Sequence, residues 1–153
     1  MIHELLDVQS ACAEAGVDIR WQIRKDVGQC LAIDAATLDP SWCETDFLDC
    51  LRENNCIAMV AIRCERVVGF MVYALHRTSL NVLRFAVDPA CQRQGIGTAM
   101  VARLIDKLNR QRRTRIEIDV PDHLLPMHCF LREMGFVATP SAEDCYRFEW
   151  SLD

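Results

Sequence analysis

Residues 87–98 read Val-Asp-Pro-Ala-Cys-Gln-Arg-Gln-Gly-Ile-Gly-Thr, and this stretch decides the fold. It predicts a strand that ends at Val87, a tight turn, and a helix that begins on two glycines, because Pro89 cannot donate to a strand ladder. The first turn of a helix leaves backbone N–H groups without partners, and glycines let an anion approach them closely. The stretch therefore predicts a cradle for phosphate, to which the side chains of Gln92 and Arg93 add donors.

Other nucleotide-binding loops do not fit this stretch. No Gly-Lys-Ser/Thr follows Gly95 at the spacing of a Walker A loop, and the Gly-x-Gly-x-x-Gly fingerprint of dinucleotide-binding folds is incomplete. The alternative is an ordinary strand–turn–helix junction whose glycines serve only the turn. The Val-x-Pro turn, the Gln-Arg pair and the amphipathic helix that follows together favour the phosphate cradle.

Strands and helices alternate along the rest of the chain. Hydrophobic periodicity and turn residues predict seven strands, at 19–25, 56–63, 67–75, 81–87, 116–120, 136–138 and 145–152. They predict four helices, the first opening at Asp26 and the others at 41–54, 95–110 and 125–134. Capping boxes are expected at Asp26/Gln29 and Ser41/Glu44. This order predicts an α/β domain with a mixed central sheet.

Length and composition predict one soluble domain over residues 1–153. The chain has 51% hydrophobic and 25% charged residues, as ordinary globular proteins do, and no stretch reaches the roughly 20 apolar residues of a membrane span. The first residues lack the basic and apolar regions of a signal peptide, so a cytoplasmic location is expected. A net charge of -5 and a pI near 5.3 disfavour a nucleic-acid partner. The arginines between positions 110 and 115 are better explained by the end of a helix or by attraction of phosphates.

Nine cysteines are scattered along the chain without the spacing of a metal site. No Cys-x-x-Cys occurs, and the four histidines include no His-Glu-x-x-His, so no metal ligands are predicted. Most of the cysteines lie among apolar neighbours, as Cys30 does, which is typical of buried thiols in a reducing compartment.

Three further segments accompany the phosphate cradle. They are Ser41-Trp42-Cys43-Glu44-Thr45-Asp46-Phe47, Val68-Gly69-Phe70 and Phe130-Leu131-Arg132-Glu133-Met134-Gly135-Phe136. Together with Gln92, Gly95 and Gly97, which meet the pattern Gln/Arg-x-x-Gly-x-Gly/Ala, they resemble the GNAT N-acetyltransferases. The Trp42 segment resembles the RimI-like branch, which acetylates protein N-termini. The resemblance covers most of the chain and implies a GNAT-type domain whose central strands splay apart, with acetyl-CoA as co-substrate.

The resemblance implies how acetyl-CoA is held. Backbone groups of Phe85 and Val87 pair with the pantetheine amides like an added strand, and the amides of residues 93–98 hold the pyrophosphate. The Val87 N–H serves the developing oxyanion of the acetyl carbonyl. The expected cofactor-binding residues are Phe85, Ala86, Val87, Gln92, Arg93, Gln94, Gly95, Ile96, Gly97 and Thr98.

The resemblance also implies a carboxylate base on the strand before the last helix. Counting back from Gly135 and Phe136 places Asp119 at that position, and a small shift in alignment would place Glu117 there instead. The alternative is that both are solvated strand carboxylates paired with Arg115.

The tyrosine that reprotonates the departing thiolate in the family is missing. Leu131 stands at its position, so Tyr146, or else Tyr73, is expected to supply the hydroxyl. The asparagine that opens this helix in the family is replaced by Leu124. A CoA thiol with a pKa of about 8.5 also leaves as a thiolate with little help. Further candidate proton carriers are Asp122, His123 and His128.

The chain is therefore expected to transfer acetyl from acetyl-CoA to a primary amine by direct attack in a ternary complex. An N-terminal α-amine with a pKa of about 7.8 is roughly one-third neutral at about pH 7.5, whereas a lysine with a pKa of about 10.4 is only about 0.1% neutral. A general base that is weak or displaced from the family position therefore lowers the rate least when the acceptor is the α-amine of a protein N-terminus. Trp42 either lines the peptide site or anchors its helix. A small-molecule amine acceptor and a non-catalytic acyl-CoA-binding module are the alternatives, and the protein is expected to be a monomer or a homodimer.

Overall fold

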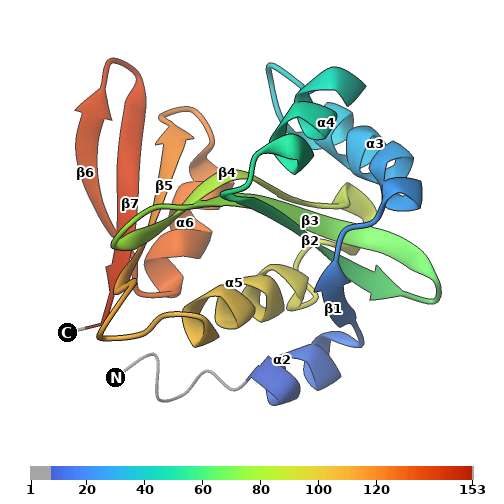
Figure 1. The fold of residues 1–153 in the computed structure, drawn as a ribbon, viewed down its shortest axis with the longest axis horizontal. Helices are drawn as coiled ribbons and strands as arrows, with labels where there is room; N and C mark the ends of the chain where they lie inside the picture. Colours follow the sequence, from blue (N-terminus) through green and yellow to red (C-terminus); the bar gives the residue numbers. More distant parts are fainter. Residues whose placement is uncertain (1–7, 153) are drawn as a thin grey trace.

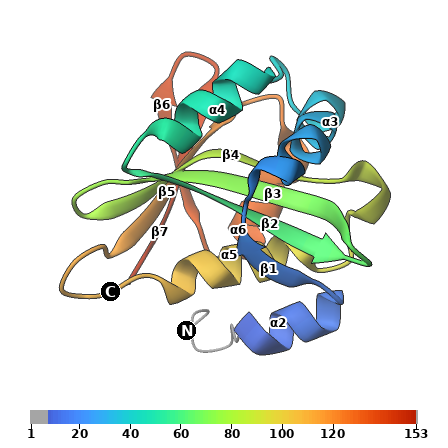
Figure 2. The same cartoon turned by 45° about the vertical axis from the view of Figure 1, so that its right-hand side comes forward.

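The computed structural model describes residues 8–152, in which a seven-stranded sheet carries helices on both faces (Figures 1 and 2). The strands are β1 (Asp18–Trp21), β2 (Cys56–Arg63), β3 (Arg66–Leu75), β4 (Ser79–Val87), β5 (Arg115–Pro121), β6 (Val137–Ala142) and β7 (Cys145–Ser151). The helices are α2 (Val8–Ala15), α3 (Val27–Thr37), α4 (Glu44–Arg52), α5 (Ile96–Asp106) and α6 (Leu125–Glu133), with 3-10 turns η1 (Arg24–Asp26) and η2 (Pro89–Cys91). The sheet order is β1-β2-β3-β4-β5-β7-β6, and only β4 and β5 pair in parallel.

The predicted α/β fold with a mixed sheet of seven strands is confirmed. The prediction of four helices is wrong, because residues 8–152 contain five α-helices. The additional helix, α2, has Ala15 as its one fully buried residue, so its sequence carries little apolar periodicity. β1 is also shorter than predicted, since the chain turns into η1 instead of continuing the strand.

Neither predicted capping box forms. The carboxylate of Asp26 accepts from Arg20 and from the Ile23 N–H, and Gln29 Oε1 instead accepts from the Val67 N–H at 2.9 Å. At the start of α4, the box lies two residues further along the chain, where Asp46 Oδ2 accepts from the Cys43 N–H at 2.8 Å. In both places an aspartate accepts from the backbone N–H three residues before it, Asp26 from Ile23 and Asp46 from Cys43, so the boxes form at other residues than those predicted.

The sheet separates two apolar cores. On one face α3 and α4 pack over the middle strands around Phe47 and Phe70, and on the other face α2, α5 and α6 enclose a larger core that includes Met100 and Phe148 (Figure 1). β3 is buried from Val67 to Ala74, because both of its faces are covered. The strands in the middle of the sheet are therefore held on both sides, and β4 takes part in both cores.

β4 and β5 pair over only part of their length. Their parallel ladder joins residues 79–82 to residues 115–118, although β4 continues to Val87 and β5 continues to Pro121. Past this ladder β4 stays paired with β3 and β5 stays paired with β7. The predicted splay of the central strands is confirmed.

A β-bulge marks the point where the two strands separate. On the β3 side of β4, Tyr73 faces Val82 and Val72 faces Arg84, so Leu83 is the extra residue. A bulge bends its strand and increases the local twist. Because the bulge directly follows the last residue that pairs with β5, it turns the rest of β4 away from its parallel neighbour.

Stability is expected to depend on pH through Asp26. Burial favours the neutral acid, but the Arg20 guanidinium and the Ile23 N–H outweigh it and lower the pKa of this carboxyl. Such a group stabilises the fold above its unfolded-state pKa of about 3.9, and that contribution is lost as the pH falls through the folded-state pKa. Asp26→Asn should lower the free energy of unfolding by about 1–3 kcal/mol at about pH 7 and by less at about pH 3, as measured by urea denaturation.

Asp49→Asn is the matched control. The Asp49 side chain is 63% exposed and lies 3.5 Å from Arg52, so its removal should change the free energy of unfolding by less than about 0.5 kcal/mol. An Asp26→Asn deficit of equal size at both pH values would contradict the assignment.

Candidate active site

A groove of about 810 Å³ lies between β4, the start of α5 and α6. One wall is formed by Phe85 and Val87 of β4 and by the residues around Gly95 and Gly97, and the other wall by α6. Its volume is in the range of sites that hold cofactors and drug-sized ligands. Of the predicted cofactor-binding residues, eight line this groove: Phe85, Val87, Gln92, Arg93, Gly95, Ile96, Gly97 and Thr98.

The phosphate cradle has the backbone that an anion site requires. Arg93 and Gly95 have φ values of 64° and 84°, so the chain makes two left-handed steps before the helix starts. The first hydrogen bond of α5 runs from the Ala99 N–H to the Gly95 carbonyl at 3.0 Å. The amides of residues 96–98 precede that ladder, at the positive end of an 11-residue helix. These amides are the donors available to a pyrophosphate.

Gly97 lies beside the rings of Phe85 and Phe130. A Cβ at this position would lie 3.3 Å from Cζ of Phe130 and 3.6 Å from Cζ of Phe85. The two rings pack with their centroids 6.1 Å apart. Any side chain at position 97 would therefore meet these rings and reduce the space beside the cradle.

The free edge of β4 faces the groove. The Asp88 N–H donates to the Val68 carbonyl of β3 at 2.8 Å. Because successive residues of a strand direct their backbone groups to opposite edges, those of Val87 and Phe85 face away from β3, toward the position that β5 has left. The Val87 carbonyl accepts from Gln92 Nε2 at 3.2 Å, which connects the cradle to the strand.

Two of the predicted cofactor residues do not line the groove. By the same alternation the backbone groups of Ala86 face β3, and its side chain is buried in the core beneath α3 and α4. The Gln94 side chain accepts a hydrogen bond from Arg63, which also donates to the Ala15 carbonyl. Gln94 thus attaches the cradle to β2 and α2 instead of facing the groove.

The two candidate bases lie on the sheet face opposite α6, because Ile116, Ile118 and Val120 fill the core on the α6 side. Asp119 accepts two hydrogen bonds from Arg147, at 3.0 and 3.2 Å, and its side chain is 45% exposed. Glu117 accepts from Arg115 Nε at 3.1 Å and is more buried. Of the two, only Asp119 belongs to the part of β5 that no longer pairs with β4.

The candidate acids lie elsewhere. Tyr146 of β7 faces Val120 and packs on the ring of His128 from α6, with 5.5 Å between centroids, so it is on the other sheet face from Asp119. His128 Nε2 hydrogen-bonds the Pro121 carbonyl at 2.9 Å. Leu131, at the position of the family tyrosine, is a core residue.

Tyr73 is enclosed in the core. It is 0% exposed, and burial raises the pKa of its hydroxyl to about 12, against a smaller opposing effect of Arg103. A hydroxyl so placed does not reach a groove ligand. Asp122 and His123 lie in the turn between β5 and α6, outside the residues that line the groove.

Sequence reasoning missed the second wall of the groove. Its residues on α6 are Leu125, Pro126, Met127, Cys129, Phe130 and Glu133. The available signal was the width of the apolar stripe, since Met127 and Phe130 are not fully buried although they neighbour the core. A stripe wider than packing requires indicates a ligand-facing surface.

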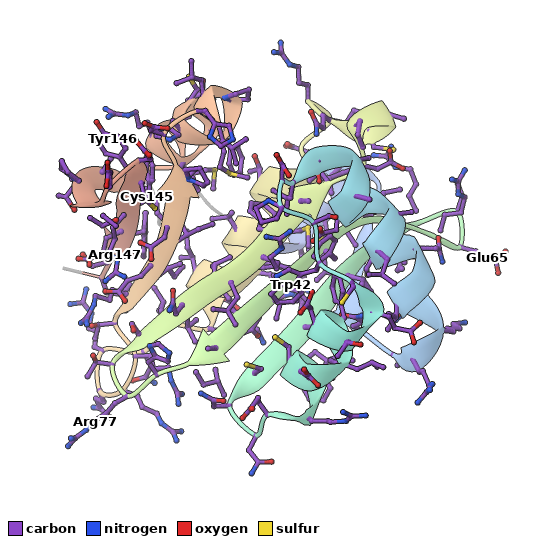
Figure 3. All side chains as sticks on the ribbon, turned by 90° about the horizontal axis from the view of Figure 1, so that it is seen from above. Trp42, Glu65, Arg77, Cys145, Tyr146 and Arg147 are labelled. Carbon is purple, nitrogen blue, oxygen red and sulfur yellow. The ribbon has the colours of Figure 1, made fainter. Side chains whose placement is uncertain are left out.

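Across the divergence of β4 and β5, the α3–α4 connection faces β7. Viewed from above, Trp42 and Arg147 lie on opposite sides of this divergence (Figure 3). The Trp42 ring packs edge-on against Phe47, with centroids 5.1 Å apart, and belongs to the core between α3, α4 and the sheet. Trp42 therefore anchors the connection between these helices.

Residues 21–136 match the family model described as the acetyltransferase (GNAT) family. The chain belongs to the GNAT family of acetyltransferases. The match includes β4, the phosphate cradle and α6, which are the three elements that form the groove. The protein is thus an acetyltransferase of the GNAT family, whose members use acetyl-CoA as co-substrate.

Solved GNAT structures share this fold at low sequence identity. Ard1 from Thermoplasma volcanium superposes with a TM-score of 0.80 at 24% identity, covering 90% of this chain and 98% of that one. The ribosomal-protein-S18-alanine N-acetyltransferase from Escherichia coli gives 0.74 at 18%, covering 87% and 90%. Arabidopsis thaliana NAA60 in complex with a bisubstrate analogue gives 0.75 at 14%, covering 88% and 97%. A search of curated proteins returned no match.

None of the helices in residues 8–152 is both long enough and apolar enough to cross a lipid bilayer.

The cradle assignment predicts the effect of filling position 97. Gly97→Trp should weaken acetyl-CoA binding at least about 100-fold in isothermal titration calorimetry, because the indole would occupy the space between Phe85 and Phe130. Gly28→Trp is the control, since a Cβ at Gly28 meets no atom within 4 Å and the residue lies on α3. Unchanged affinity in Gly97→Trp would remove the cradle from the acetyl-CoA site.

Proposed function

We propose that the protein transfers acetyl from acetyl-CoA to the α-amine of a protein N-terminus, by direct attack in a ternary complex. The observation that carries this proposal is the opening between β4 and β5. The groove beside Phe85 and Val87 lies on one side of this separation, and Asp119 and the α3–α4 connection lie on the opposite sheet face. In this proposal acetyl-CoA and the amine are held on opposite faces of the sheet and meet where the strands separate, which gives the proximity that direct transfer requires.

Binding of acetyl-CoA is assigned to backbone groups. The amides of residues 96–98 serve the pyrophosphate, and the outward backbone groups of Phe85 and Val87 serve the pantetheine as an added strand would. The Val87 N–H is assigned as the donor for the acetyl carbonyl oxygen, because it faces away from β3 and has no partner in the sheet that residues 8–152 form. None of these groups titrates, so binding should vary little with pH near neutrality.

Asp119 is the preferred base. It is the first β5 residue past the last pair of the β4–β5 ladder, Val82 and Ile118. Glu117 lies opposite Asn81, where the two strands still pair, so an amine in the opening is nearer to Asp119. The Arg147 guanidinium already donates to both oxygens of Asp119, so part of this carboxylate's capacity to accept a proton is occupied, and the arrangement suits an acceptor that is already partly neutral.

That requirement supports an α-amine over a lysine. An α-amine is roughly one-third neutral at about pH 7.5 and a lysine about 0.1% neutral, so a weak base limits the lysine far more. The Trp42 segment resembles the RimI-like branch, and the E. coli structural neighbour is by its name a ribosomal-protein-S18-alanine N-acetyltransferase. Transfer to an N-terminal residue therefore accounts for more observations than transfer to a side chain.

A panel of amines tests the acceptor class. Purified protein and acetyl-CoA are incubated with peptides that have free N-termini, with N-blocked lysine peptides, and with polyamines and amino acids, and products are measured by mass spectrometry. Peptides with free N-termini should be acetylated at least about 100-fold faster than lysine side chains, given the difference in neutral amine. Acetylation confined to small amines or to lysines would contradict the N-terminal assignment and retain the enzyme class.

The base assignment is tested by paired variants. Asp119→Asn should lower kcat at least about tenfold, because a general base typically contributes about 100-fold or more. Glu117→Gln is the control on the same strand face and should lower kcat less. A larger loss in Glu117→Gln than in Asp119→Asn would transfer the role to Glu117.

A further inference from the structure

We infer that Arg84 is a positioning residue of the acceptor site: it holds residues 38–43, between α3 and α4, in register with the strand that binds acetyl-CoA. The inference rests on the proposed function only in placing the acceptor on the α3/α4 face of the opening. Arg84 directly follows the bulge residue Leu83 and directly precedes Phe85. The same short segment of β4 therefore faces acetyl-CoA with its free edge and the acceptor connection with one of its side chains.

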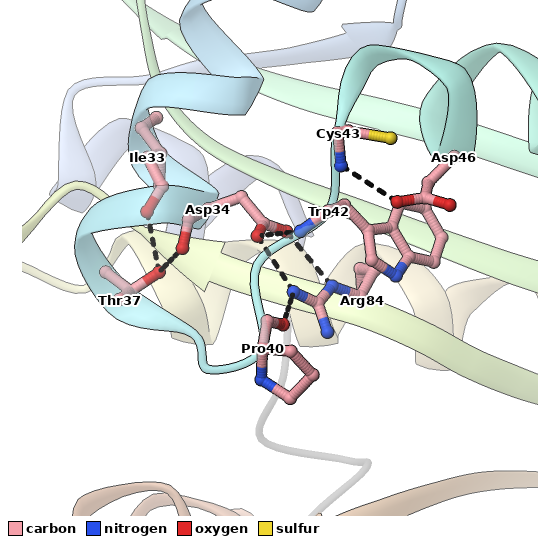
Figure 4. A network of polar contacts seen from close by, with 8 residues as sticks. All are labelled: Ile33, Asp34, Thr37, Pro40, Trp42, Cys43, Asp46 and Arg84. Atoms are coloured by element: carbon pink, nitrogen blue, oxygen red, sulfur yellow. Dashed lines mark hydrogen bonds and ion pairs between the residues drawn. The ribbon is translucent and has the colours of Figure 1, made fainter.

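The contacts of Arg84 converge on that connection (Figure 4). Its Nε donates to Asp34 Oδ2 at 3.0 Å and its Nη2 donates to Asp34 Oδ1 at 2.8 Å. Nη2 also donates to the Pro40 carbonyl at 3.0 Å. The guanidinium carbon lies 5.1 Å from the centroid of the Trp42 ring, within the range of a cation–π contact. One side chain thus contacts the last turns of α3 and two points of the following connection.

Asp34 completes the attachment. Its side chain is 0% exposed, and Oδ1 accepts a second hydrogen bond from the Trp42 N–H at 2.8 Å. The connection is therefore held at both ends: at Pro40 by Arg84, and at Trp42 by Asp34 and by packing on Phe47. An arginine suits this role because its planar fork fixes direction as well as charge, which a lysine does not.

The pair has an orienting effect beyond any contribution to stability. Buried ion pairs are often replaceable by apolar residues without loss of stability, because desolvation offsets their attraction. What an apolar pair cannot reproduce is the bond to the Pro40 carbonyl and the alignment of Trp42. In Figure 3, Trp42 in this part of the chain lies across the divergence of β4 and β5 from Arg147, the residue that hydrogen-bonds Asp119.

A second ion pair in the same protein supplies a matched control. Asp26, adjacent to the start of α3, has a side chain that is 2% exposed and accepts two hydrogen bonds from Arg20, at 2.7 and 3.0 Å. This pair joins β1 to η1 and contacts no part of residues 38–43. It has the same chemistry and comparable carboxylate burial, but no link to the acceptor face.

The experiment compares Arg84→Lys with Arg20→Lys. For each variant we would measure the KM of the best amine acceptor, the Kd of acetyl-CoA by calorimetry, the Tm, and amide hydrogen exchange of residues 38–43. Arg84→Lys should raise the acceptor KM at least about tenfold and speed exchange of 38–43, with the Kd of acetyl-CoA changed less than about twofold. Arg20→Lys should lower the Tm without changing the acceptor KM or that exchange.

Several results would overturn the inference: an unchanged acceptor KM in Arg84→Lys, an acetyl-CoA Kd weakened in the same proportion, or the same KM effect in Arg20→Lys. If Arg84→Lys fails to fold, the double substitution Asp34→Leu with Arg84→Met keeps an apolar core and must still raise the acceptor KM. The exchange readout needs no substrate, so it tests the attachment even if the acceptor is not a protein N-terminus.

Discussion

The site depends on a single constraint, the loss of pairing between β4 and β5 after Val82 and Ile118. Backbone N–H and C=O groups that leave a ladder must find other partners, because leaving them unpaired is costly when they are buried. Here the free edge of β4 lines a groove that begins at the phosphate cradle and continues along α6. An extended ligand with amide groups and a pyrophosphate satisfies both parts of this surface, and acetyl-CoA is such a ligand.

The opening is maintained by packing on either side of it. β3 holds β4 from one edge and is itself buried between the two cores, while β7 holds β5 along its whole length. The bulge at Leu83 fixes where the strands part, and the Arg84–Asp34 pair fixes what covers β4 on the α3/α4 face. The bulge residue Leu83 and Arg84 are adjacent on β4, so in the proposed function one short segment of backbone would set both the direction of the acceptor wall and the path of acetyl-CoA.

The cradle was predictable from sequence and the acid–base groups were not, for physical reasons. The left-handed φ at Gly95 and the open amides of α5 are local requirements, so a few adjacent residues encode them. The position of Tyr146 on the sheet face opposite Asp119 depends on the pairing of β5 with β7, which no local pattern specifies. Asp34, the partner of Arg84, is 50 residues away in the chain, and no sequence pattern near either residue predicts that they pair. Helix α2 was missed because it has little apolar periodicity to detect.

The central claim is that acetyl-CoA binds to the edge of β4 that does not pair with β5 and to the first backbone amides of α5. Amide hydrogen exchange with and without CoA measures this directly, residue by residue. CoA should protect the amides of Phe85, Val87 and residues 96–98, while the amides of Ala86 and Asp88, which already face β3, should change little. Protection that is absent from 85–98, or that appears only at residues of the α3/α4 face, would contradict the claim.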